Sequence, residues 1–326
     1  SYYILPRVLR DVSNIDTATT LLGQKVTTPI GVAPTGRYHV AHTDAEIPVA
    51  KAAKRRGMCM IQSIFSYKSI EEVTESCEGE GLRWMQVQPM NDRPVLADII
   101  QRAEKANYKA IVVTCDYPRL PMHYKIMKIW PPSPSPSDAK GHYAGNFSKE
   151  WNDFIYSDLS GLRKVLEKHI INPGTWEIVD WVRSVTSLPI VLKGILHPDD
   201  AREAIKHDIQ AIQVSNHGGR NIDETPPTLY ALPEIIKAVN GKVEVYVDGG
   251  IRQGTDVLKA LALGARAVFV GRPIVWGLAC NGEDGVYDVL RILGNEFEYA
   301  MSFAGCSSLA DITSDIVRHK THYTKQ

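Results

Sequence analysis

The sequence predicts a (β/α)8 barrel, and three observations lead to that prediction. Eight short apolar runs recur along the 326 residues, and most are separated by stretches of helical length and pattern. The runs are continuously apolar rather than alternating, as in parallel strands that are buried on both faces. Almost every run ends on a polar residue or a glycine, at the end of the strand where barrel enzymes carry their chemistry. We therefore expect one barrel domain spanning residues 1–326.

The order of the runs gives the predicted elements. The strands are residues 29–34, 58–63, 83–88, 110–116, 189–194, 211–217, 243–250 and 267–272. The helices are residues 46–56, 93–105, 159–170, 176–185, 198–206, 229–239, 255–263 and, after the last strand, 285–309. An open, doubly wound sheet is the alternative. It is disfavoured because no G-x-G-x-x-G turn follows the first strand.

A long interval, residues 117–188, separates the fourth strand from the fifth. Residues 130–137 read WPPSPSPS, which neither a helix nor a central strand accommodates. Long connections in compact domains are commonly functional or disordered. We expect a mobile loop over the barrel mouth at about residues 130–150.

Composition excludes several classes of partner. Lysine plus arginine equals aspartate plus glutamate at 37 each, which gives no indication of nucleic acid or an anionic membrane surface. No apolar run is long enough to span a membrane. The five cysteines are odd in number and match no zinc spacing, so we expect reduced thiols, no metal and an intracellular protein. The last residues match no peroxisomal tripeptide, and both cytoplasm and peroxisome stay open.

The most informative stretch is residues 211–223, AIQVSNHGGRNID. A buried strand runs into Ser215, and His217 and Arg220 follow around two glycines. Histidine titrates near neutral pH, and arginine offers a planar cation for a carboxylate or phosphate. The pair indicates proton abstraction from a bound acid. The alternative is a glycine-rich turn with a solvated arginine.

Glycines and arginines also follow the last two predicted strands, as DGGIR at residues 248–252 and as Gly271-Arg272. In barrels the loops after strands seven and eight often hold a phosphate, which suits backbone N–H groups and arginine. Two ordinary turns with surface arginines are the alternative.

These motifs, together with APT at 33–35, TCDYPR at 114–119 and LKG at 192–194, resemble the FMN-dependent α-hydroxy acid oxidase and dehydrogenase family. The resemblance covers nearly the whole chain. It implies FMN at the barrel mouth and oxidation of an (S)-2-hydroxy acid to the 2-oxo acid. Oxygen, giving H2O2, or another acceptor would reoxidise the flavin. It also implies a homotetramer.

The resemblance carries roles onto individual residues. It implies that His217 is the base, that Asp116 stabilises the protonated imidazole, that Arg220 binds the substrate carboxylate and that Lys193 stabilises the reduced flavin. The implied ring contacts are Pro34, Thr35, Gly36, Ser63, Gln86, Thr114 and Lys193. The implied ribityl and phosphate contacts are Ser215, Asp248, Gly249, Gly250, Arg252, Gly271 and Arg272.

Three departures from the family pattern concern the substrate pocket. Gln88 stands where the family has a tyrosine, His123 where a second arginine is usual, and Phe65 where tryptophan is common. A lost hydrogen bond to a charged group weakens binding by about 1.5–3 kcal/mol. We expect retained FMN chemistry with altered or weakened substrate choice. One alternative is a flavin-binding homologue that has lost catalysis and serves a partner; another is a different FMN barrel enzyme, which would not explain residues 215–220.

Overall fold

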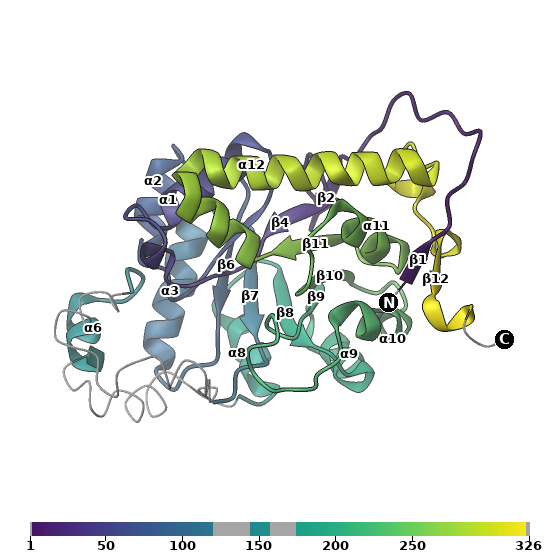
Figure 1. The fold of residues 1–326 in the computed structure, drawn as a ribbon. Helices are drawn as coiled ribbons and strands as arrows, with labels where there is room; N and C mark the ends of the chain where they lie inside the picture. The colour runs from purple at the N-terminus through teal and green to yellow at the C-terminus, as the bar shows by residue number, and fades with distance from the viewer. Residues whose placement is uncertain (1, 120–143, 157–173, 324–326) are drawn as a thin grey trace.

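The computed structural model describes residues 2–119, 144–156 and 174–323, and in the second range the side chains as far as Asp153. Within these ranges eight parallel strands close into a barrel in the order β4 to β11 (Figure 1). The prediction of a (β/α)8 barrel is confirmed, and each predicted strand is present. The strands are β4 Ile30–Val32, β5 Met60–Gln62, β6 Arg83–Val87, β7 Ile111–Thr114, β8 Ile190–Ile195, β9 Ala211–Val214, β10 Glu244–Asp248 and β11 Ala267–Val270.

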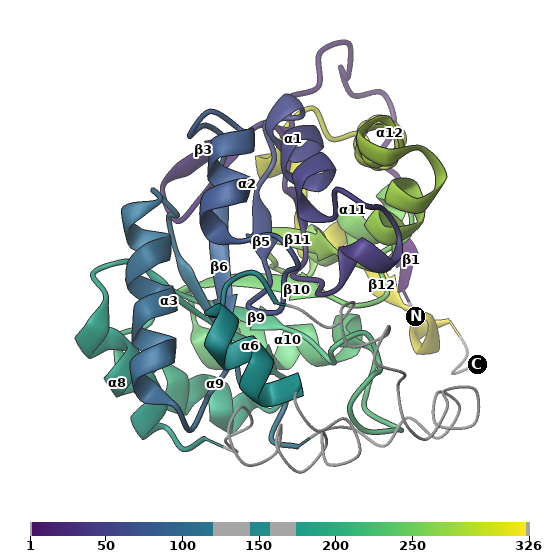
Figure 2. The same ribbon diagram turned by 90° about the vertical axis from the view of Figure 1, so that its left-hand side faces the viewer.

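Helices surround the strands on their outer side (Figure 2). They are α1 Glu46–Arg55, α2 Ile70–Ser76, α3 Arg93–Lys105, α6 Lys149–Tyr156, α8 Glu177–Val185, α9 Pro198–Ala204, α10 Thr228–Val239, α11 Gly254–Ala262 and α12 Arg272–Ala304. The helices α1, α3, α8, α9, α10 and α11 agree with the predicted ranges to within two residues. None of the helices in the described ranges is both long and apolar enough to cross a membrane.

Three helices differ from the prediction: α12, α2 and α6, the last of which belongs to the segment described next. The last helix, α12, begins at Arg272 rather than 285 and ends at Ala304 rather than 309. Asn281 and Gly282 have non-helical backbone angles within it, so a kink hides its first part from a search for one periodic pattern. The short helix α2 was not predicted; Ser69 and Glu72 form a capping box at its start. The helix predicted at 159–170 lies outside the described residues.

The expected mobile loop at 130–150 is wrong over its last part. Residues 130–143 lie outside the described residues. Beyond them Ala144, Asn146 and Phe147 are buried, and α6 begins at Lys149. The side chain of Asn152 holds this segment, because its amide both accepts from Ala144 N and donates to Ala144 O, each at 3.0 Å.

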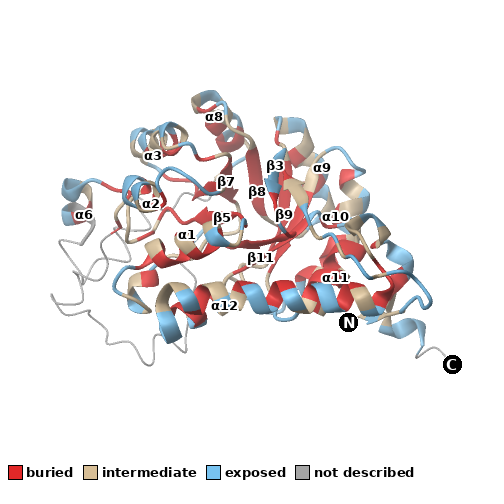
Figure 3. Ribbon diagram, turned by 90° about the horizontal axis from the view of Figure 1, so that it is seen from above, coloured by how far each residue is buried: buried red, intermediate tan, exposed pale blue. Residues whose placement is uncertain are grey.

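The strands alternate between two apolar clusters, and both clusters are buried (Figure 3). Residues such as Val32, Val113 and Val214 face the helices. The other face fills the barrel interior with Trp84, Tyr246 and Phe269, whose rings lie 5.4 to 5.7 Å apart, and with small residues. A packed interior of this kind leaves no pore through the barrel.

A hairpin closes the end of the barrel at which the strands begin. Strands β2 Thr19–Leu21 and β3 Gln24–Val26 form it, and Leu21 joins the interior cluster. Leu22 N donates to Glu244 Oε2 at 3.3 Å, at the start of β10. The remaining elements are η1 Tyr38–Val40, η3 Ile205–His207, η4 Leu309–Asp311, η5 Ser314–Ile316, η6 Lys320–His322 and the antiparallel pair β1 Tyr2–Ile4 and β12 Val317–His319.

Two glycines test how tightly α12 is packed. A Cβ on Gly254 would collide with the backbone of Glu296 and Phe297 in α12, whereas a Cβ on Gly294 would meet only the flexible end of Arg56, at 3.2 Å. We expect Gly254→Ala to lower the free energy of unfolding by about 1–3 kcal/mol. The matched variant Gly294→Ala adds the same methyl group and should be neutral or stabilising by up to ~1 kcal/mol. Urea unfolding measures both, and equal losses would contradict this packing.

Candidate active site

The interior of the barrel changes from apolar to polar toward the ends of the strands. Side chains alternate along a strand, so residues two beyond Trp84, Val112, Val191, Ala211 and Tyr246 also point inward. These residues are Gln86, Thr114, Lys193, Gln213 and Asp248, and all are buried. Gln86 joins neighbouring strands: its Nε2 donates to Thr114 Oγ1 at 3.0 Å and its Oε1 accepts from Ile64 N at 3.2 Å. Three of the residues predicted to contact the flavin ring, Gln86, Thr114 and Lys193, thus lie in one polar layer.

Lys193, Ser215 and Asp248 form the centre of this layer. Lys193 Nζ donates to Ser215 Oγ at 3.2 Å, and Ser215 Oγ donates to Asp248 Oδ1 at 2.5 Å. Lys193 Nζ also lies 3.7 Å from Asp248 Oδ2, and both side chains are less than a tenth exposed. The lysine therefore carries its charge in a region almost free of water, where it acts strongly on any ligand at the mouth.

The predicted base and its partner are in direct contact. His217 Nδ1 lies 2.9 Å from Asp116 Oδ1, so the ring donates from Nδ1 and leaves Nε2 free to take a proton. His217 has the left-handed φ of 55°, a conformation that non-glycine residues adopt mainly where function or packing requires it. Its backbone N–H donates to Ser215 Oγ at 3.0 Å. Base and cation are therefore linked through one serine.

A glycine allows this contact. Asp116 follows β7 and His217 follows β9, and β8 lies between them with Gly194 at φ 105°. A Cβ on Gly194 would lie 2.6 Å from both Cβ and Cγ of Asp116. The side chain of Asn221 donates to the backbone carbonyl of Asp116 and holds the other side.

The environment keeps Asp116 ionised. Burial alone would raise the pKa of Asp116. The hydrogen bond from His217 and the charge of Lys193 outweigh that effect, so the pKa lies below its ordinary value of 3.8. A carboxylate beside Nδ1 stabilises the imidazolium that forms when Nε2 takes a proton.

The loop after β5 carries Ser63 and Phe65, and buried polar groups hold it from two sides. Glu46, fully buried at the start of α1, accepts from Tyr67 N at 3.1 Å and from Lys68 N at 2.9 Å. From the other side Asn146 Nδ2 donates to the carbonyls of Ser63 and Ile64 at 3.2 and 3.1 Å. This fixes the two residues predicted to face the flavin and the substrate.

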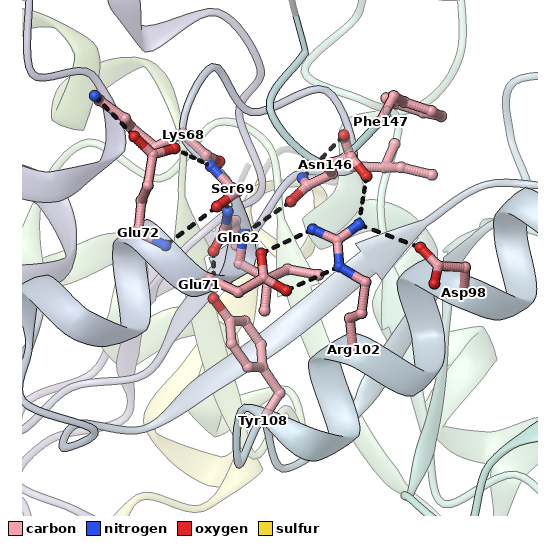
Figure 4. Close-up of polar contacts among 12 residues, drawn as sticks. Gln62, Lys68, Ser69, Glu71, Glu72, Asp98, Arg102, Tyr108, Asn146 and Phe147 are labelled. Carbon is pink, nitrogen blue, oxygen red and sulfur yellow. Dashed lines mark hydrogen bonds and ion pairs between the residues drawn. The ribbon is translucent and has the colours of Figure 1, made fainter. Parts of the chain in front are cut away.

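Figure 4 shows how Asn146 is itself held. Arg102 Nη1 in α3 donates to Asn146 O at 2.8 Å, and Arg102 also binds both carboxylate oxygens of Glu71 in α2, at 2.7 and 2.8 Å. The next residue, Phe147, stacks on Phe65 with ring centroids 6.0 Å apart. The segment beyond residue 143 thus forms part of the wall behind Phe65.

Four features of the barrel mouth suit a flavin mononucleotide. Gly36 lies against the next loop, since a Cβ there would be 3.3 Å from Phe65 O, and Gly271 approaches Thr35 in the same way at 3.7 Å. A Cβ on Gly250 would meet nothing within 4 Å, so the space beside this residue is open to a ligand. The long helix α12 begins at Arg272 and directs its N-terminus at the mouth, as phosphate sites require. Asp116 Oδ2, buried and without a hydrogen-bond partner among the described residues, leaves an acceptor for a ligand.

The remaining predicted residues are placed as follows. Arg220, Arg252 and Arg272 are exposed, and Arg272 Nη2 donates to Gly218 O at 2.9 Å, which links the two predicted anion-binding loops. Gln88 is buried and Phe65 is partly buried. His123 lies outside the described residues. Sequence reasoning missed Gln213, Asn146 and Asn221; their partners lie 35 to 105 residues away in the chain, so no local pattern marks them.

Comparison with known proteins gives a consistent result. The sequence pattern of the family described as FMN-dependent dehydrogenase matches residues 1–319. The chain is 48% identical to 2-hydroxyacid oxidase 1 of Homo sapiens over 317 residues, covering 97% of this chain and 85% of the relative. It is 43% identical to the peroxisomal (S)-2-hydroxyacid oxidase GLO3 of Arabidopsis thaliana over 313 residues, covering 96% and 84%. A crystal structure of mandelate oxidase superposes with a TM-score of 0.85 at 38% identity, covering 95% and 84%.

The lowered pKa of Asp116 predicts a pH dependence of stability. A carboxyl group whose pKa is lower in the folded protein contributes stability above its unfolded pKa, and this contribution is lost as the pH falls through the folded value. The amount by which Asp116→Asn lowers the free energy of unfolding should shrink as the pH falls below 3.8. Urea titrations from pH 7 to pH 3 measure it. Asp223→Asn, at an exposed position of the neighbouring loop, controls for loss of a carboxylate, and parallel curves for the two variants would refute the assignment.

Proposed function

Because the chain belongs to the FMN-dependent dehydrogenase family, we propose that it oxidises an (S)-2-hydroxy acid to the corresponding 2-oxo acid. The observation that supports this most directly is the hydrogen bond between His217 and Asp116 at the barrel mouth. It leaves a base with a free nitrogen in the same turn as Arg220, three residues before it, and Ser215 links this base to the cation Lys193. A binding protein without catalysis has no need of this arrangement, and no relative named above supports one.

Each of these residues has one task in the proposed reaction. Arg220 binds the substrate carboxylate through its guanidinium fork. Nε2 of His217 takes a proton from the substrate, either from the hydroxyl or from the α-carbon, and Asp116 stabilises the resulting imidazolium. When bound, FMN would supply the two-electron acceptor, and oxygen, which would give H2O2, or another acceptor would be the final oxidant.

The proposed cofactor contacts follow the polar layer and the glycine turns. Lys193 stabilises negative charge on the reduced ring, and Ser63, Gln86 and Thr114 offer hydrogen bonds to its edges. Ser215 and Asp248 stand toward the ribityl chain. The flavin ring lies against Pro34, Thr35 and Gly36. The phosphate is held by Gly249, Gly250, Arg252, Gly271 and Arg272.

The proposed pocket departs from the family pattern at Gln88, Phe65 and His123. Gln88 is buried two residues beyond Gln86, so a buried amide takes the position where a phenol is usual. Phe65 lacks the indole N–H of a tryptophan. We infer that this chain binds small hydroxy acids less tightly than its relatives and accepts larger ones.

We also infer self-association, in the homotetramer that the family resemblance implies. The outer face of α12 supports this, because Ile292, Tyr299 and Phe303 are 47%, 68% and 78% exposed at helical spacing. An intracellular location, peroxisomal or cytoplasmic, is supported by the name of the Arabidopsis relative and by cysteines that form no disulfide among the described residues.

The reaction is tested by reducing the flavin without oxygen. Wild-type holoenzyme should be yellow and should bleach with one or more members of a panel of (S)-2-hydroxy acids. His217→Gln should keep its colour while bleaching at least about 100-fold more slowly, because general-base catalysis contributes that much or more. Stopped-flow absorbance measures both rates. Bleaching of the variant at the wild-type rate would reject His217 as the base.

Restoring a phenol tests the pocket. Gln88→Tyr should raise kcat/KM for glycolate about tenfold to a hundredfold, the equivalent of one hydrogen bond to a charged group. Gln88→Phe is the matched control, since it adds the same ring without the hydroxyl. If both variants gain equally, ring packing rather than a hydrogen bond accounts for the effect, and the role given to position 88 is wrong.

A further inference from the structure

Gln213 is a buried polar residue to which the proposed reaction gives no task. It lies in the middle of the barrel interior on β9, and none of its surface is exposed. Its Nε2 donates to Asp248 Oδ2 at 2.6 Å, while its carbonyl Oε1 has no hydrogen-bond partner among the described residues. Burying a half-paired amide is unfavourable, so a strand interior retains one only at a cost. The position therefore calls for an explanation beyond packing.

The two oxygens of Asp248 have different partners. Oδ1 accepts from Ser215 Oγ at 2.5 Å. Oδ2 accepts from Gln213 at 2.6 Å, and Lys193 Nζ stands farther from the same oxygen, at 3.7 Å. The amide thus hydrogen-bonds the same carboxylate oxygen that pairs with the lysine.

We propose that Gln213 is a positioning residue that holds Asp248 in a loose pair with Lys193 and so leaves the lysine charge available to the reduced flavin. The attraction between two charges grows as their separation shrinks, and it is strong in a buried site. Without the amide, Oδ2 closes on Nζ, and the cation is largely neutralised by its own protein. This inference rests on the proposed function, in which Lys193 stands beside the flavin ring.

The geometry limits where the effect acts. Lys193 is bonded to Ser215 Oγ at 3.2 Å, which leaves two of its three N–H groups for other acceptors. Gln213 pairs directly with Lys193 in the register of β8 and β9, so the two side chains are neighbours in one layer. A change at Gln213 therefore reaches the flavin through Lys193 and Asp248.

The test is the midpoint potential of bound FMN in Gln213→Met, which keeps the length of the side chain and removes the amide. At a fixed potential the ratio of reduced to oxidised flavin should fall about tenfold, a negative shift of about 30 mV for a two-electron couple. Photoreduction of the holoenzyme with a reference dye measures this and needs no substrate. An unchanged potential would overturn the proposal.

Gln62→Met is the matched control. Gln62 is equally buried in β5 but faces outward, where its Nε2 donates to Lys68 O at 3.1 Å and its Oε1 accepts from Tyr108 (Figure 4). The Gln62→Met variant should be less stable than wild type, and its bound FMN should keep the wild-type midpoint potential. An equal shift in both variants would assign the effect to general loosening of the barrel and overturn the proposal.

A double-mutant cycle tests the path through the lysine. In the background of Lys193→Met, Gln213→Met should cause no further shift, because the charge it protects is absent. A full additional shift would show that Gln213 acts without Lys193. If Gln213→Met does not retain FMN, Gln213→Asn carries the same test, since it keeps a buried amide but withdraws it by one methylene. If the variants show these shifts and the wild type bleaches with no hydroxy acid, the proposed reaction is refuted and this inference stands.

Discussion

The hydrogen bond between Asp116 and His217 is the contact on which the site depends. It joins the ends of β7 and β9, which are not neighbours, by passing over β8 at the one residue without a side chain, Gly194. Two further hydrogen bonds keep these residues in place. Asn221 donates to the backbone carbonyl of Asp116, and Ser215 Oγ accepts from the N–H of His217. The closed barrel fixes the register of β7, β8 and β9. Their ends therefore lie close together in space although they are far apart in the sequence.

The barrel interior combines two requirements that usually conflict. Large apolar rings fill its lower part and stabilise the fold, while five polar side chains form the layer above them. The alternation of side chains along each strand makes this possible, because one step of two residues takes the chain from Trp84 to Gln86 or from Tyr246 to Asp248. The polar groups are almost all paired with one another, so the layer is formed before any ligand binds, and its charges are oriented by the fold rather than by water.

The sequence was sufficient for the architecture and for much of the site. Buried parallel strands are continuously apolar, so all eight were recognisable, and the motif around His217 lies within nine residues of β9. What escaped prediction depends on distant contacts. The kink at Asn281 interrupts the period of α12, and Asn146 acts on carbonyls more than eighty residues earlier in the chain. In the sequence, Gln213 is only a polar residue within an apolar run. Its hydrogen bond to Asp248 becomes evident only in the folded barrel. Conversely, the proline-rich stretch before residue 138 led to the prediction of a mobile loop that includes residues 144–147, although Ala144, Asn146 and Phe147 are buried.

The hairpin at the closed end of the barrel affects how substrate, product and oxidant reach the polar layer. Leu21 and the ring cluster fill the space beneath the polar layer, so in the described part of the chain the layer is closed on the side where the strands begin. The hydroxy acid enters, the oxo acid departs and the oxidant arrives by the same route. Oxygen is small enough to reach the flavin while the oxo acid is still bound. A bulky oxidant can bind only after the oxo acid has left. The fold therefore selects oxidants by size as well as by their chemistry.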